Sequence, residues 1–228
     1  MVGTIINVVS VVAGSCIGLA FGHRLPSRIS ETVMQAMGLF TFFIGLRMAW
    51  GTADPFMLLL SLVAGTTLGS ALDIEGRLDR LGERIRQRVG AADGGSFTQG
   101  FVAASLLYCV GPMAIMGSLQ DGLSGDFTVL ATKSVMDGTA SVALSSGLGA
   151  GVAFSALPLL AYQGSISLMA GALRPLMTEA VVREMTAAGG ILMLGIGLNL
   201  ILRTRVRVAN MIPALFGAAL AAGLFMKG

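Results

Sequence analysis

Charged residues that interrupt apolar sequence are the first candidates for chemistry in this chain. Asp126, Lys133 and Asp137 are separated by seven and four residues, so all three fall on one face of any helix that contains them. A charge within hydrocarbon costs several kcal/mol unless it is paired, so such residues are commonly functional. The two carboxylates could bind a cation or a proton, and Lys133 could pair with Asp137 or bind an anionic solute. At this stage both a membrane-embedded and an interfacial position of the pair stay open.

Further polar side chains lie close to two predicted helix breaks. Gly111-Pro112 should interrupt its helix because proline removes a backbone hydrogen bond, and Gly164 is the second predicted break. Free backbone groups and small hydroxyls beside such breaks line ion and solute sites in many transporters. The alternative is a packing kink in which serines bond to their own helix. The candidate binding residues are Gln120, Asp121, Asp126, Lys133, Asp137, Gln163 and Ser165.

The sequence lacks the patterns of an enzyme or a metal site. It contains no HExxH, no nucleophile beside a histidine and no nucleotide-binding loop. Its one histidine, His23, and its two cysteines, Cys16 and Cys109, are too dispersed for a metal cluster. We therefore expect no catalytic residue, no metal and no cofactor. Nucleic-acid binding is not expected either, because membrane topology accounts for the arginines in short loops.

The composition indicates an integral membrane protein. Of 228 residues, 54% are hydrophobic and only 12% are charged, whereas soluble domains carry about 25% charged residues. The mean hydropathy is +0.82. So few charges cannot cover a water-facing surface, and so many apolar residues exclude a disordered chain. We predict an all-α polytopic helical bundle, with residues 1–228 forming a single transmembrane domain whose first partner is the lipid bilayer.

Charge-free segments predict about eight membrane-spanning helices, because a bilayer core of about 30 Å requires ~20 helical residues. The predicted spans are residues 2–22, 33–50, 55–72, 97–119, 128–152, 156–173, 186–202 and 208–226. Residues 73–90 combine apolar residues at helical spacing with five arginines, which predicts an amphipathic helix on the cytoplasmic surface. With eight crossings, the arginine-rich loops at Arg24 and at residues 203–207 lie on that side, and the acidic loop at residues 121–126 lies outside.

Two internal similarities predict an inverted repeat. Residues 9–20 match residues 60–71, and residues 36–50 match residues 187–201 with a shared Ile-Gly-Leu. Five crossings separate the second pair, so its copies have opposite orientations, as in many secondary transporters. The alternative is that helices rich in glycine, alanine and leucine resemble one another by composition. Glycines four residues apart allow close helix packing, which could join helices within one chain or in a homo-oligomer.

The polar motifs also support a family resemblance. The segments GPMAIMGSLQDGLSGD, KSVMDG and LPLLAYQGS, together with the opening GTIINVVSVVAGS, resemble the YdfK/YqgA-like family of bacterial inner-membrane proteins, a domain-of-unknown-function family. The resemblance covers nearly the whole chain. It implies a multi-pass protein of the bacterial inner membrane, and it supplies neither a substrate nor a mechanism.

These observations favour a secondary transporter of an ion or small solute that works by alternating access between inverted repeats. A channel could use the same polar residues to line a pore. A third interpretation, from a different class, is a structural or assembly protein in which the glycine rows serve only helix packing. A small ion or metabolite is the expected partner in the first two cases.

The orientation can be tested with introduced cysteines. Cysteines at Arg80 and Arg205 should react with an impermeant thiol reagent only from the cytoplasmic side, and a cysteine at Gly125 only from outside. Accessibility of Gly125 and Arg205 from the same side would contradict the eight-span arrangement and, with it, the inverted repeat.

Overall fold

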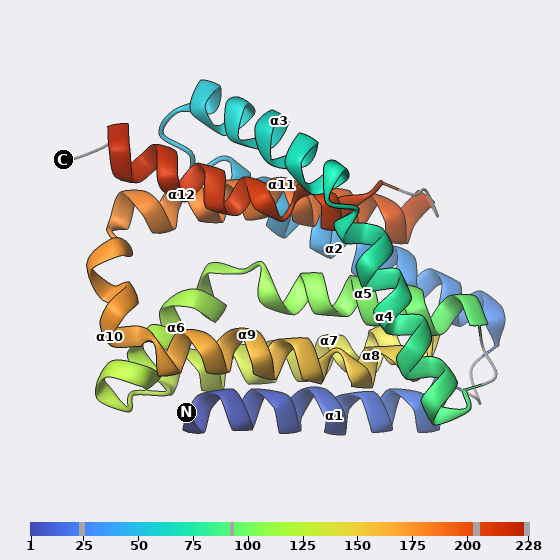
Figure 1. Ribbon diagram of the computed structural model, residues 1–228. Helices are drawn as coiled ribbons and strands as arrows, with labels where there is room; N and C mark the ends of the chain where they lie inside the picture. Colours follow the sequence, from blue (N-terminus) through green and yellow to red (C-terminus); the bar gives the residue numbers. More distant parts are fainter. Residues whose placement is uncertain (23–25, 92–93, 203–205, 226–228) are drawn as a thin grey trace. The chain divides into compact units, whose positions relative to one another are not determined.

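The computed structural model describes residues 1–22, 26–91, 94–202 and 206–225, and every regular element in these ranges is a helix (Figure 1). The predicted all-α fold class is therefore confirmed. The predicted loops at Arg24 and at residues 203–205 lie outside the described residues. The helices are α1 (Val2–Gly22), α2 (Ser27–Ala49), α3 (Pro55–Ala71), α4 (Ile74–Val89), α5 (Gly94–Cys109), α6 (Pro112–Ser124), α7 (Thr128–Leu148), α8 (Gly151–Phe154), α9 (Ala156–Leu168), α10 (Ala170–Leu173), α11 (Glu179–Leu202) and α12 (Pro213–Phe225), with the short 3₁₀ helices η1 (Arg174–Leu176) and η2 (Val208–Met211).

Several of these helices are long and apolar enough to cross a bilayer. Among the described residues five helices meet this condition, or up to seven if each of two bent helix pairs counts as one span. The difference from the eight predicted spans is α7, whose Lys133, Asp137 and small polar residues lower its hydropathy. Large apolar side chains such as Phe43, Phe56 and Leu220 are more than half exposed, as expected for lipid-facing surfaces. The protein is thus a polytopic helical membrane protein.

The two bent pairs coincide with features of the sequence. α5 and α6 meet at 62° across Gly111, where Pro112 begins the second helix. α3 and α4 meet at 52°, at the boundary between the predicted span 55–72 and the predicted amphipathic helix 73–90. By contrast, the break predicted at Gly164 is absent, because α9 continues through this residue to Leu168. Glycine keeps its backbone donor and costs a helix only about 1 kcal/mol, so a single glycine does not have to end a helix.

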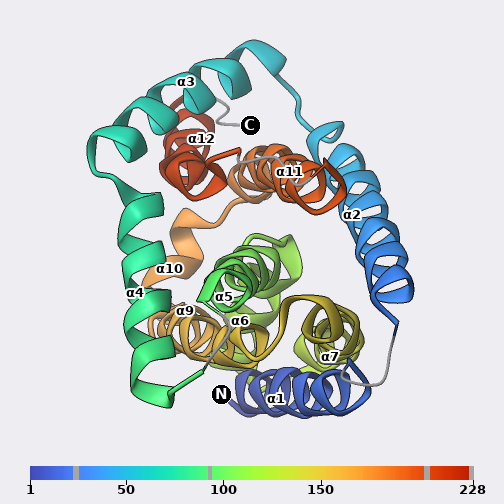
Figure 2. The same ribbon diagram turned by 90° about the vertical axis from the view of Figure 1, so that its right-hand side faces the viewer.

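The chain folds into two compact units. Unit 1 comprises residues 1–37, 79–109 and 113–171, and unit 2 comprises residues 38–78, 110–112 and 172–228. In unit 1, α1 and α7 pack side by side (Figure 2). Gly14 faces Gly138, and Gly18 faces Val142, so residue numbers rise together along both helices and the two run parallel. A Cβ atom on Gly14 would lie 2.2 Å from the carbonyl oxygen of Gly138, so only glycine permits this approach.

Close glycine contacts also organise unit 2. On α2 and α11, Gly45 faces Gly190 and Gly38 faces Gly197, so these helices run antiparallel. On α3 and α12, Gly65 faces Ala214 and Ser61 faces Gly217, so these helices also run antiparallel. A Cβ on Gly65 would lie 2.3 Å from the Ala214 nitrogen. The parallel pair joins the first and fifth predicted spans, and the antiparallel pairs join the second to the seventh and the third to the eighth. The same directions would occur in eight alternating crossings, and the number of crossings stays a prediction.

We expect the Gly14 contact to dominate the stability of unit 1. Gly14→Ala should destabilise the protein by about 1–3 kcal/mol, because the new methyl group forces α1 and α7 apart. Gly171→Ala is the matched control: it is also a helical position, but a Cβ there would meet nothing within 4 Å, so its unfolding midpoint should be unchanged or slightly higher. Thermal unfolding in detergent measures both, and equal midpoints for the two variants would contradict the proposed close packing.

Candidate functional site

Lys133 and Asp137 form an ion pair within α7. The side chains lie one helical turn apart, and only 5% of Lys133 and 7% of Asp137 is exposed. Asp137 follows the first residue of α7 by nine positions, about 13.5 Å at 1.5 Å per residue, in a helix whose 21 residues span about 31 Å. The pair therefore occupies the interior of unit 1, and Asp137 lies near the middle of a helix as long as the bilayer core is thick.

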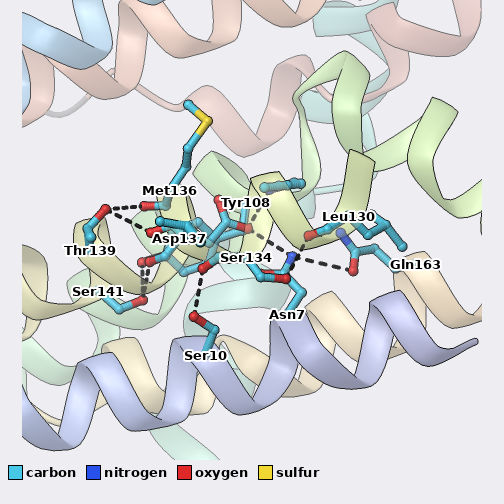
Figure 3. A network of polar contacts seen from close by, with 12 residues as sticks. Asn7, Ser10, Tyr108, Leu130, Ser134, Met136, Asp137, Thr139, Ser141 and Gln163 are labelled. Atoms are coloured by element: carbon cyan, nitrogen blue, oxygen red, sulfur yellow. Dashed lines mark hydrogen bonds and ion pairs between the residues drawn. The ribbon is translucent and has the colours of Figure 1, made fainter. Parts of the chain in front are cut away.

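Two carboxamides from other helices extend this pair. The side-chain nitrogen of Asn7 on α1 donates to Asp137 Oδ2 at 3.0 Å and also approaches Gln163 Oε1 on α9 at 3.4 Å (Figure 3). Asn7 and Gln163 are both fully buried. The negative charge of Asp137 thus fixes the orientation of both amides, because a reversed Asn7 would aim its oxygen at the carboxylate and a reversed Gln163 would oppose two NH₂ groups.

Tyr108 adds an aromatic hydroxyl from the end of α5. Ser141 donates its hydroxyl proton to the backbone carbonyl of Asp137 at 2.7 Å, so the Tyr108 hydroxyl donates to Ser141 Oγ, also at 2.7 Å. The Tyr108 ring centroid lies 5.9 Å from Lys133 Nζ, which is within the range of a cation–π interaction. Tyr108 lies in the last turn of α5, just before the break between α5 and α6. We call Asn7, Tyr108, Lys133, Asp137, Ser141 and Gln163 the polar centre.

The polar centre contains two hydrogen-bonding atoms that are not used. Asn7 Oδ1 and Gln163 Nε2 are both buried and have no hydrogen-bond partner among the described residues. A buried polar atom left without a partner costs about 1–3 kcal/mol, so such atoms mark positions for water or another small polar molecule. One is an acceptor and the other is a donor.

The structure brings three of the predicted binding residues together in one network of contacts, and the recorded contacts of the described residues do not join the other four to that network. Lys133, Asp137 and Gln163 belong to the polar centre. Gln120 is half-buried on α6. Ser165 is exposed and donates to the carbonyl of Tyr162 on its own helix at 2.9 Å, which is the bond expected of a serine in a helix rather than of a binding residue.

Asp121 and Asp126 cap helices. Asp121 is buried and accepts a hydrogen bond from the backbone nitrogen of Gly3 at 3.2 Å, and it also pairs with the Met1 ammonium group at 3.0 Å. Asp126 is exposed at the start of α7, where its carboxylate accepts from the backbone nitrogen of Thr128 at 3.0 Å. The hydrogen bonds from Thr128 lower the pKa of Asp126. Both carboxylates thus satisfy backbone donors at helix N-termini, where negative charge is stabilising.

The sequence-based set of binding residues missed three members of the polar centre, Asn7, Tyr108 and Ser141, and one further buried charge. Asn7 is one of few polar residues in an apolar helix, and Tyr108 lies close to the Gly111-Pro112 break. Both positions could therefore have been recognised in the sequence as candidate site residues. In unit 2, Glu184 is 3% exposed and accepts from the Thr52 hydroxyl and from the Ala53 nitrogen, the latter at 2.8 Å. Glu184 thereby holds the connection between α2 and α3. No sequence pattern indicated this partner, because Glu184 and Thr52 are 132 residues apart.

The polar centre offers several groups that can bind a small solute. It offers one ammonium group, one carboxylate, two fixed amides and two hydroxyls, and the described residues hold no group of three or more His, Cys, Asp or Glu side chains suited to a metal ion. These charges and hydrogen-bonding groups can hold a small polar solute or ion.

Comparisons with known proteins agree on one family. The family model of DUF554, described as a protein of unknown function, matches residues 2–222. Among the relatives, "Uncharacterized membrane protein YdfK" of Bacillus subtilis (strain 168) is 32% identical over 219 residues, covering 94% of this chain and 93% of its own. "Uncharacterized protein YqgA" of Escherichia coli (strain K12) is 28% identical over 222 residues, with the same coverage. No solved structure matches the chain. The chain therefore belongs to the DUF554 family, and with it to the relatives of YdfK and YqgA that the sequence motifs indicated.

Proposed function

We propose that this protein is a secondary transporter of a small solute or ion in the bacterial inner membrane, and that the solute binds at the polar centre. The observation that carries the proposal is the buried pair of Lys133 and Asp137 near the middle of a membrane-length helix. Ionisable residues at such positions mark substrate and ion pathways, because hydrocarbon does not tolerate them without a role or a partner.

A purely structural role explains the pair less well. Both residues lie on α7, so their ion pair does not join two helices. Replacing a buried ion pair with apolar residues of similar volume is often neutral or stabilising, so packing alone gives no reason to retain these charges. The unused atoms of Asn7 and Gln163 also favour a binding role over a structural role. A buried hydrogen-bond network adds stability only when all of its polar atoms have partners.

Contacts within unit 2 support the predicted inverted repeat. The Ile-Gly-Leu match equates Gly45 with Gly197, and the same shift equates Gly38 with Gly190. If each residue of α2 is replaced by its equivalent on α11, and the reverse, the contact of Gly45 with Gly190 becomes the contact of Gly197 with Gly38. Both contacts are present in the structure. This reciprocity is typical of two copies related by a twofold axis. In this second similarity, α11 and the part of α2 from residue 38 onward belong to unit 2, whereas the polar centre belongs to unit 1. We therefore propose that the α2–α11 pair forms a frame and does not line the binding site.

The broken helix is the segment that we propose changes during transport. α5 and most of α6 belong to unit 1, but residues 110–112 belong to unit 2. Within unit 2, Val110 packs closely against Gly189, because a Cβ atom on Gly189 would lie 2.8 Å from Val110 Cγ1. Tyr108, two residues before Val110, reaches the polar centre through Ser141. A change in the bend would move Tyr108 and alter access to Lys133 and Asp137.

Ligand-induced stabilisation tests this proposal although the solute itself is not identified. A panel of ions and small metabolites should include at least one class that raises the thermal unfolding midpoint of the purified protein. The same solutes should have no effect on Asp137→Asn or Lys133→Gln, because these variants lack one charge of the centre. Asp126→Asn and Ser165→Ala, which change exposed candidates outside the centre, should respond like the native protein.

Two results would contradict the proposal, the first its binding site and the second its transporter assignment. Stabilisation of equal size in all four variants would place the binding site elsewhere. Steady single-channel currents from purified protein in planar bilayers, without saturation or coupling to a second ion, would identify a channel.

A further inference from the structure

We propose that the solute of the polar centre is a small zwitterion that carries one ammonium group and one carboxylate group. This inference rests on the proposed function and names the class of its substrate. The ammonium group of the solute would bind Asp137 and its carboxylate would bind Lys133, so that each member of the resident ion pair exchanges its partner for one end of the solute.

The charge balance of the site favours this class. Lys133 and Asp137 contribute one charge of each sign, and both are almost completely buried. A lone anion or a lone cation would leave an excess charge in a poorly solvated site, which is costly unless a proton also moves. A zwitterion adds both charges together, so the site stays neutral and no proton has to be transferred. A neutral solute would leave the resident pair intact and gain hydrogen bonds alone.

The unused hydrogen-bonding atoms match the same class. Asn7 Oδ1 is an unpartnered acceptor, and Gln163 Nε2 is an unpartnered donor, each on a fully buried residue. An ammonium group supplies donors for the first, and a carboxylate supplies acceptors for the second. Because the charge of Asp137 fixes both amides, the site offers one additional acceptor and one additional donor in a set orientation. A solute with two ammonium groups or two carboxylates would satisfy only one of them.

Without the solute, Lys133 and Asp137 neutralise each other's charges, which the two ends of the solute would otherwise do. Asp137 and Lys133 contact each other because they lie one turn apart on α7, and in this state the Lys133 ammonium group occupies a position on Asp137 that the solute's ammonium group would take. The lysine side chain is long and flexible, so it can withdraw to meet the solute's carboxylate. One contact is then replaced by two, and this gain offsets the ordering of the solute.

Matched series of small probes test the class directly in purified protein. The zwitterions glycine, β-alanine and 4-aminobutyrate differ only in the spacing of their two charges. The controls with a single charge are acetate, propionate and butyrate, and methyl-, ethyl- and propylammonium. At least one zwitterion at saturation should raise the unfolding midpoint by about 5 °C or more, with a preferred spacing, whereas the matched single-charge compounds should produce less than half of that rise.

Variants sharpen the test by changing the charge of the site. Asp137→Asn leaves Lys133 alone, so its preference should change from the zwitterion to the matched carboxylate. Lys133→Gln leaves Asp137 alone and should prefer the matched ammonium compound. Gln163→Leu keeps both charges and removes the open donor, so it should bind the zwitterion at least about tenfold more weakly, as expected for one lost hydrogen bond to a charged group. Ser165→Ala on the same helix should bind as the native protein does.

The outcomes separate this inference from the function on which it rests. If a single-charge probe stabilises the native protein as strongly as every zwitterion, and the effect disappears in Asp137→Asn or Lys133→Gln, the polar centre is a solute site but the zwitterion assignment is wrong. If no zwitterion stabilises the native protein, the assignment is also wrong. If neither these probes nor the broader panel produces stabilisation that depends on Lys133 or Asp137, both proposals fail. Should Asp137→Asn not fold, Gln163→Leu and Lys133→Gln give the same decision.

Discussion

The buried ion pair of Lys133 with Asp137 is the constraint from which the organisation of unit 1 follows. A charge removed from water needs a partner of opposite sign and hydrogen bonds for its remaining atoms. Asp137 meets this need with Lys133 on its own helix and with Asn7 on α1. Asn7 reaches it only because α1 approaches α7 closely, and that approach depends on Gly14 and Gly18. The close packing at Gly14 and Gly18 and the polar centre therefore depend on each other.

Close packing through glycine has the same physical origin in both units. Lipid is as apolar as the helices, so the hydrophobic effect does not drive helices together in a membrane, and contact between backbones and hydrogen bonds between helices become more important. Unit 2 relies on the contacts of Gly45 with Gly190 and of Gly65 with Ala214, and its buried charge, Glu184, holds a connection between helices. Unit 1 instead retains an ion pair within one helix, and the polar centre around that pair holds two buried polar atoms without a hydrogen-bond partner among the described residues. This difference is why we assign solute binding to unit 1.

The sequence was sufficient for the helical class and for the central charges, and insufficient for the roles of individual carboxylates. Lys133, Asp137 and Gln163 were identifiable because charges and amides are conspicuous in apolar helices. Asp121 and Asp126 have the same residue type and similar surroundings in the sequence, yet both cap helices, and only the position of the backbone donors reveals this. Gly164 was interpreted as a break although its helix continues, because a buried glycine that serves packing and one that ends a helix look alike in sequence. The contacts of Asn7 and Glu184 bridge more than one hundred residues, and no local pattern encodes them.

The measurement that tests this account most directly is a stability cycle on the ion pair in detergent, with solute binding measured alongside. Lys133→Leu and Asp137→Leu should each destabilise the protein by about 3–5 kcal/mol, because each strands a buried charge, and the double variant should recover most of that loss while binding no solute. Glu83→Ala and Arg86→Ala, which break a surface ion pair on α4, serve as the matched control and should change the unfolding midpoint little. If both single variants and the double variant unfold like the native protein, the pair is solvated, and the polar centre described here is not the functional site.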